Sequence, residues 1–94
     1  MGLRFADSAT KRGISVERIT YVIDHAGLWF DVPAQDENDY EIDGVLFVGD
    51  DAQGVAVEVV AVEFEDDDVL VLHAMKLRRK HQSFYEQAMP CRLP

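Results

Sequence analysis

The sequence predicts an α+β fold: two N-terminal helices, a four-stranded antiparallel sheet meander, and a C-terminal helix packed on the sheet. Three observations predict it. Apolar residues recur at three- and four-residue spacing near both ends of the chain, short apolar runs separated by turn-rich segments fill its middle, and the links between these runs are short. A chain of 94 residues has room for a single domain. We expect residues 5–88 to form its folded core and residues 89–94 a loose tail.

The first two predicted elements are helices. Residues 5–12 form the first, and Gly13 suits the position just after a helix end. Ser15 is a typical N-cap for the second helix, and Ile14 and Ile19 occupy the two positions of a hydrophobic staple around it. The apolar stripe of this second helix comprises Val16, Ile19, Val22, Ile23 and Ala26. The helix is expected to end near residues 25–27.

Four apolar runs predict the strands of the sheet, at residues 28–32, 45–48, 55–64 and 69–75. They are separated by polar, turn-rich segments at residues 34–43, 49–54 and 65–68. The last two runs are apolar at consecutive positions, as at Val59 and Val60, which is typical of strands covered on both faces. We therefore expect these two strands to be central in the sheet.

The helical period returns over residues 77–89, and Pro90 ends it. The apolar stripe of this last helix comprises Leu77, His81, Phe84 and Ala88. Because short links favour a meander with its helices on one face, we expect the first helices and the closing helix to lie side by side.

The charges divide the chain into three parts. The whole chain has 18 acidic and 9 basic residues and a formal net charge of −9, which argues against a general affinity for DNA or anionic membranes. No Lys or Arg lies between Arg18 and Lys76, so both ends are cationic and the middle is anionic. If the two ends meet in space, the fold carries one basic patch on an acidic body.

The composition argues against several classes of protein. The single cysteine, Cys91, excludes an intramolecular disulfide and favours a reducing compartment. The apolar runs are short for a membrane span and no leader opens the chain, so we expect a soluble, cytoplasmic protein without membrane contact. The three histidines and Cys91 lack the spacing of zinc ligands, so we expect no metal and no other cofactor.

The segment from residue 72 to residue 81 carries the residue types that RNA cleavage without a metal requires. A base must take the 2′-OH proton, an acid must protonate the leaving oxygen, and cations must stabilise the phosphorane. Histidine as a residue type changes its charge in the appropriate pH range. On a strand, His73 shares a face with Met75, while Lys76 falls on the other face. The alternative is that this basic segment anchors the domain to an acidic partner or to its own acidic middle.

Two stretches carry a resemblance to a known family. Residues 11–17 are similar to a Lys-His-Gly-Val-Ser-plus-acid helix opening, and residues 72–86 are similar to an Ile-Ser-Ala-Arg strand end followed by a basic helix and a closing Tyr-Glu. These motifs belong to the BrnT-like toxins of the RelE-like superfamily, from bacterial toxin–antitoxin modules, which the chain resembles over roughly residues 5–88. It departs from them at Met75, which replaces the catalytic Arg, at His73, which replaces the Ser, and at Arg12, which replaces the His.

The resemblance implies a metal-independent endoribonuclease that inhibits translation and growth and that a small DNA-binding antitoxin holds inactive. The implied partners are RNA and this antitoxin, in a hetero-oligomer, with a homodimer as the other assembly. The candidate catalytic residues are His73, Lys76, Arg79, Tyr85 and Glu86, of which Tyr85 and Glu86 rest on the resemblance alone. The candidate RNA-binding residues are Lys11, Arg12, Arg78, Lys80 and His81.

A second hypothesis belongs to a different class. The chain can be a non-catalytic acidic binding protein, either a diverged toxin that keeps only its partner surface or a mimic of nucleic acid. The base-free stretch over residues 24–68 favours this hypothesis, because an anionic body repels RNA and slows its capture.

Overall fold

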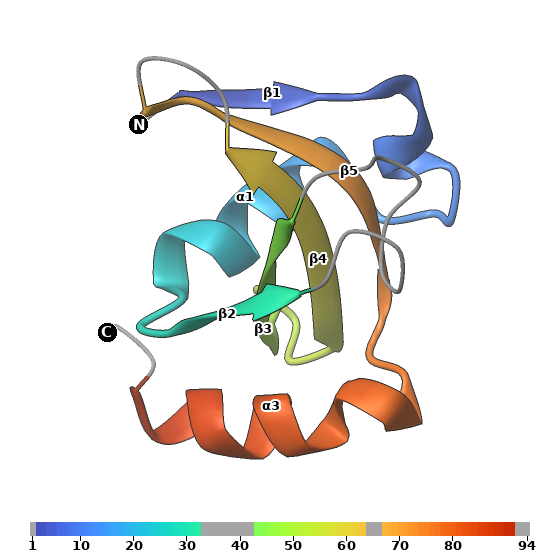
Figure 1. The fold of residues 1–94 in the computed structure, drawn as a ribbon. Helices are drawn as coiled ribbons and strands as arrows, with labels where there is room; N and C mark the ends of the chain where they lie inside the picture. Colours follow the sequence, from blue (N-terminus) through green and yellow to red (C-terminus); the bar gives the residue numbers. More distant parts are fainter. Residues whose placement is uncertain (1, 33–42, 64–66, 92–94) are drawn as a thin grey trace.

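The computed structural model describes residues 2–32, 43–63 and 67–91, and these form a five-stranded mixed sheet in the order β1-β5-β4-β3-β2 (Figure 1). The strands are β1 (Leu3–Phe5), β2 (Trp29–Val32), β3 (Gly44–Asp50), β4 (Ala56–Glu63) and β5 (Val69–Lys76). The α-helices of the described part are α1 (Val16–His25) and α3 (Gln82–Ala88), and the 3-10 helices are η1 (Asp7–Thr10), η3 (Arg79–His81) and η4 (Met89–Cys91). The molecule is therefore of the α+β class.

The prediction of a four-stranded, purely antiparallel sheet with two N-terminal helices is wrong. The start of the chain forms an additional edge strand, β1, which pairs in parallel with β5, and only the 3-10 turn η1 follows where a helix over residues 5–12 was predicted. The backbone N–H of Ala6 extends the pairing by donating to the carbonyl of Val71. Three residues are too few to show a strand pattern, and their partner lies 66 positions along the chain, as in Leu3 opposite Val69.

The α1 helix begins and ends as its sequence predicts. The hydroxyl of Ser15 accepts a hydrogen bond from the backbone N–H of Arg18, which is the expected capping contact. Ile19, Val22 and Ile23 are the buried face of the helix. The strands β2 to β5 also match the four predicted runs within a few residues at each end.

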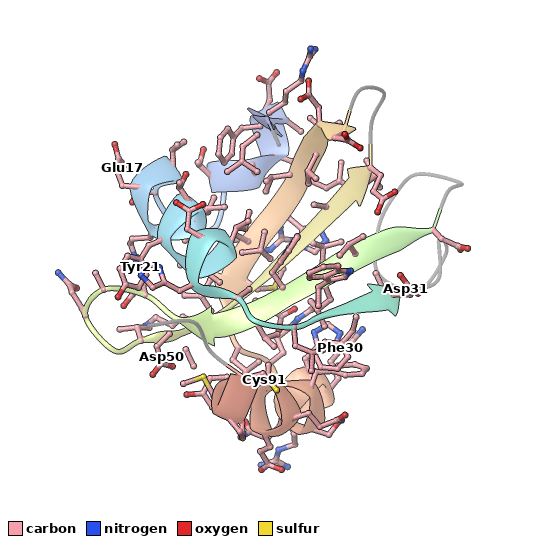
Figure 2. All side chains as sticks on the ribbon, turned by 90° about the vertical axis from the view of Figure 1, so that its left-hand side faces the viewer. Glu17, Tyr21, Phe30, Asp31, Asp50 and Cys91 are labelled. Carbon is pink, nitrogen blue, oxygen red and sulfur yellow. The ribbon has the colours of Figure 1, made fainter. Side chains whose placement is uncertain are left out.

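The two α-helices cover opposite faces of the sheet, so the expectation that they lie side by side is wrong (Figure 1). On one face α1 packs on β3 and β4 through a core that includes Phe47 and Val59. On the other face α3 packs through Phe84, Tyr85 and Ala88 on Leu46, Val48 and Val60. Figure 2 shows the ring of Phe30 directed toward α3, away from α1. Because β3 and β4 are apolar on both faces, each face needs its own cover.

The position of the last two strands confirms the prediction that they are central. β4 lies in the middle of the sheet and β5 lies between β4 and β1. The final helix begins later than predicted, because Leu77 and Arg78 precede it in a non-helical conformation and residues 79–81 form η3. Residues 89–91 form η4 rather than loose chain. Residues 92–94 of the predicted tail and most of the acidic segment at 34–43 lie outside the described residues.

No helix in the described ranges is both long and apolar enough to cross a lipid bilayer.

Candidate nucleic-acid interface

The second half of β5 carries the central residues of the predicted site. His73 is opposite Val60 of β4, and Lys76 is opposite Val57. Val60 belongs to the core under α3, whereas Val57 belongs to the core under α1. Because side chains directly opposite each other in a sheet share a face, His73 points to the α3 side and Lys76 to the α1 side. The prediction that the two residues fall on different faces is confirmed.

A β-bulge lies next to His73. Val60 pairs with His73 and Ala61 pairs with Val71, so Leu72 is the extra residue on β5. The carbonyl of Leu72 accepts a hydrogen bond from the hydroxyl of Ser8 in η1 at 2.6 Å. The bulge thus attaches the start of the chain to β5 immediately beside His73, which is half-buried and whose Nδ1 atom is enclosed.

The segment that joins β5 to α3 is held by a buried carboxylate. The side chain of Glu58 on β4 is 0% exposed and lies on the same face as His73. One of its oxygens accepts from the backbone N–H of Arg78 at 2.7 Å, and the other accepts from the Arg78 guanidinium at 2.6 and 3.0 Å. The Nδ1 atom of His81 lies 2.7 Å from the same second oxygen, and the His81 side chain is only 2% exposed.

The charge state of Glu58 follows from these contacts. Burial by itself raises the pKa of Glu58. The hydrogen bonds from the side chain and backbone of Arg78 and from His81 lower the pKa by more than burial raises it, so it lies below its ordinary value. Glu58 is therefore ionised at neutral pH. Because an ionised carboxylate only accepts hydrogen bonds, the shared hydrogen lies on Nδ1 of His81. We call Glu58, Arg78 and His81 the Glu58 cluster.

The Glu58 cluster explains why the last helix begins late. The backbone N–H of Arg78 is donated to Glu58, and Arg78 has extended torsion angles, with φ −90° and ψ 155°. A helix over this position would withdraw that donor from the buried carboxylate. Removing a donor from a buried ion costs more than one turn of helix provides.

Several cations around this cluster face solvent. Lys76 at the end of β5 and Arg79 and Lys80 in η3 are all exposed. Lys11 and Arg12 are exposed as well, in the turn that follows η1, and η1 is the element bonded to Leu72. Cations from both ends of the chain are therefore attached to one strand, β5, through η1 and η3 rather than through the two helices.

The two residues that rest on the resemblance lie elsewhere. The hydroxyl of Tyr85 donates a hydrogen bond to the carboxylate of Asp50 at 2.6 Å. Asp50 ends β3, which is separated from β5 by β4 (Figure 2). Glu86 is exposed on α3. The Tyr85 hydroxyl is therefore directed to the hairpin end of β3.

Nine of the ten predicted residues separate into three groups, and the tenth, Glu86, lies apart from them on the exposed surface of α3. Arg78 and His81 bind a carboxylate of the acidic middle of the chain, which is the anchoring alternative that the sequence left open. Tyr85 binds Asp50. The remaining cationic or imidazole groups of the prediction are distributed along β5 and its two attached turns; they are Lys11, Arg12, His73, Lys76, Arg79 and Lys80.

Glu58 is the residue that sequence analysis missed. It is the one charged residue within the run from Val55 to Val62, which is otherwise apolar. A charge in the middle of a central strand is costly to bury unless it is paired, so this position was the available signal. Its partners lie 20 and 23 positions later, and no local pattern indicates them.

We call the exposed cations on β5 and its two attached turns the cationic margin of β5; they are Lys11, Arg12, Lys76, Arg79 and Lys80. The fold and this margin define a small α+β protein with a mixed sheet and a net negative charge. Over residues 2–32, 43–63 and 67–91, no three His, Cys, Asp or Glu side chains are grouped so that they could hold a metal ion. Comparisons with protein-family models, with curated proteins and with solved structures found no match.

Proposed function

We propose that the chain is the toxin component of a bacterial toxin–antitoxin module and that it acts on RNA through the cationic margin of β5. One observation carries the proposal. The cations of both chain ends, Lys11 and Arg12 on one side and Lys76, Arg79 and Lys80 on the other, are attached to the strand that bears His73. Exposed cations in this arrangement suit the phosphates of a single RNA strand.

The Glu58 cluster supports this role by fixing the position of η3. A flexible basic turn would lose conformational entropy on binding RNA, whereas a turn already held by a buried carboxylate loses less. Arg78 and His81 then act as positioning residues for Arg79 and Lys80. Glu58 binds the Nε and Nη2 atoms of Arg78 and the Nδ1 atom of His81.

For cleavage, His73 is the candidate for proton transfer. Its ring is half-buried on the α3 side of β5, whereas Lys76, three residues later at the end of the strand, lies on the α1 side. Lys76 and Arg79 then stabilise the phosphorane, and Lys11 and Arg12 bind flanking phosphates. The loss of an arginine at Met75 leaves fewer groups near the phosphorane, which lowers the rate by about 10²–10³ if nothing else compensates.

RNA binding is tested with variants that remove one charge each. Lys76→Gln and Arg79→Gln are expected to weaken binding of a short single-stranded RNA, measured by fluorescence anisotropy at low salt, each by about three- to tenfold. The matched control is Arg4→Gln, which removes the same charge from β1, near the opposite end of β5. Equal binding by all three variants would reject the cationic margin as the RNA surface.

The toxin role is tested by expression. The chain alone is expected to arrest growth with loss of bulk RNA, and co-expression with the neighbouring gene is expected to relieve the arrest. His73→Ala is expected to abolish the arrest, whereas His25→Ala, a histidine on α1 that contacts Tyr21, is expected to preserve it. Unchanged arrest in His73→Ala would reject a role for this imidazole.

A non-catalytic binding protein is the second candidate. The observation that favours it is that three of the predicted site residues, Arg78, His81 and Tyr85, are bound by carboxylates of the chain itself. This candidate predicts that bulk RNA stays intact and that any growth arrest does not depend on His73.

A further inference from the structure

Among the described residues, α1 covers only part of its face of the sheet. Beside the C-terminal end of α1 lies an open groove of about 330 Å³. Its apolar lining comes from Ile23 and Ala26 at the end of α1 and from three strands of the sheet, through Trp29 of β2, Val45 and Phe47 of β3, and Val69 of β5. The groove is thus a stretch of sheet face that α1 leaves without a cover.

Trp29 makes this groove unusual. Its side chain is 58% exposed, although it is the only tryptophan of the chain and its neighbour across the β2–β3 pair, Phe47, is buried. The two rings lie 6.5 Å apart between centroids and are tilted by 45°. An exposed tryptophan next to an apolar hollow is typical of a protein-binding surface, because tryptophan supplies large apolar area at low entropic cost.

The rim of the groove is acidic. Asp24 lies at the end of α1 and Glu63 at the end of β4, and both are exposed. No Lys or Arg occurs in the sequence from residue 19 to residue 75, which supplies all the lining residues. The groove therefore combines an apolar floor with a purely anionic rim, and it attracts a ligand that is apolar on one side and cationic on its flanks.

We propose that this groove binds a basic amphipathic helix of a partner protein. Helices are the usual covers of sheet faces, and this one would lie beside α1 on the same face. From β2 to β5 the groove crosses three inter-strand spacings, about 14 Å, which is the length of about nine helical residues. Apolar side chains of the helix contact Trp29 and Phe47, and its lysines or arginines pair with Asp24 and Glu63.

The charges of the groove disfavour the other occupants. Two copies that dock groove to groove about a two-fold axis would place like charges opposite each other, since each copy brings the same two carboxylates and a net charge of −9. RNA is repelled by the same carboxylates. The groove also lies on the α1 face, among the elements near the start of β5, whereas the cationic margin follows the end of β5. The inference is therefore independent of the proposed function.

Trp29 itself reports binding. The probe is a synthetic helical peptide of about 14 residues with leucines on one stripe and lysines on both flanks. Titration is expected to move the tryptophan emission to shorter wavelength and to saturate. A second peptide with glutamate in place of every lysine is expected to give no shift, and a third with glutamine in place of every leucine is expected to bind at least about tenfold more weakly.

Charge-reversal variants locate the binding site. The double variant Asp24→Lys, Glu63→Lys is expected to weaken binding of the lysine–leucine peptide at least about tenfold. The control is Glu17→Lys, Glu86→Lys, which changes the net charge equally at exposed positions of α1 and α3 outside the groove, and it is expected to change the affinity less than about threefold. All four positions are exposed, so the fold is preserved in both variants.

Three results would overturn the proposal. One is an equal response to the lysine and glutamate peptides, and another is an equal loss of affinity in the two double variants. The third is a concentration-dependent dimer, detected by sedimentation, that Trp29→Ala converts into a monomer, because the groove would then be an interface between copies. None of these measurements uses RNA or growth, so failure here is distinguishable from failure of the proposed function.

Discussion

Two buried carboxylates, those of Glu58 and Asp51, differ in how far along the chain their main partners lie. The side chain of Glu58, in the middle of β4, is held by Arg78 and His81 from the segment between β5 and α3. The side chain of Asp51 is 1% exposed and is held mainly within its own hairpin, where one oxygen accepts from the backbone N–H groups of Gln53 and Val55 at 2.9 Å each. The first is a contact between distant segments and the second is a local turn.

The comparison shows how the same chemical group, a buried carboxylate, performs two structural tasks. The pKa of Asp51 is lowered, chiefly by the backbone hydrogen bond from Val55, with a further contribution from Arg18 at 2.8 Å. The pKa of Glu58 is lowered against a large effect of burial, by partners that fold onto it from elsewhere. Asp51 therefore shapes the β3–β4 turn and contacts the first turn of α1, whereas Glu58 attaches the last helix to the sheet.

The largest expected effect is that of removing Glu58. Glu58→Ala leaves the Arg78 guanidinium and the buried His81 ring without their acceptor, so we expect the free energy of unfolding to fall by about 3–5 kcal/mol. Urea unfolding followed by circular dichroism measures it. Glu63→Ala, at the exposed end of the same strand, is the control and is expected to change the midpoint little. Similar losses in both variants would contradict the role of the Glu58 cluster.

The Glu58 cluster also predicts a dependence of stability on pH. The folded-state pKa of Glu58 lies below the ordinary value of 4.5, so its contribution is complete above that pH and is lost as the pH falls through the lowered pKa. Between about pH 5 and pH 3 the wild-type urea midpoint is expected to fall more steeply than that of Glu58→Gln. Parallel curves for the two proteins would show that Glu58 is not the group that titrates.

The next effect in size is expected at Asp51. Asp51→Ala removes the acceptor of two backbone N–H groups and of Arg18, so we expect a clear fall in the urea midpoint that is smaller than that of Glu58→Ala. Asp51→Asn keeps a side-chain oxygen for the turn and loses only the charge. We therefore expect Asn to recover most of the loss, and an Asn variant as unstable as the Ala variant would make Arg18 the main partner.

The same contrast explains how much of the fold the sequence predicts. Local signals predict the correct elements: Ser15 caps α1, and the apolar runs give β2 to β5. The elements that depend on distant partners are missed. β1 exists because it pairs with β5, and the start of α3 is delayed because Arg78 serves Glu58.

The site follows the same rule. The charge pattern left open whether the two cationic ends meet in space, and it did not indicate that η1 is attached to β5 through the Leu72 carbonyl. Strand alternation correctly separates His73 from Lys76. It does not indicate which face α1 or α3 covers, because β4 is apolar on both faces. The helices were expected together because short links favour a meander with its helices on one face.

The smallest expected change in the free energy of unfolding is that of Tyr85→Phe. The hydroxyl donates to Asp50, the residue before Asp51, and so joins α3 to the hairpin end of β3. The bond is half-buried, so we expect a loss of about 1 kcal/mol in urea unfolding. Because the hydroxyl is directed to β3 and not to the cationic margin of β5, RNA affinity is expected to stay within about twofold of the wild type. A large loss of RNA affinity or of growth arrest with unchanged stability would instead place Tyr85 in the surface that binds or cleaves RNA, as its position in the family resemblance implies.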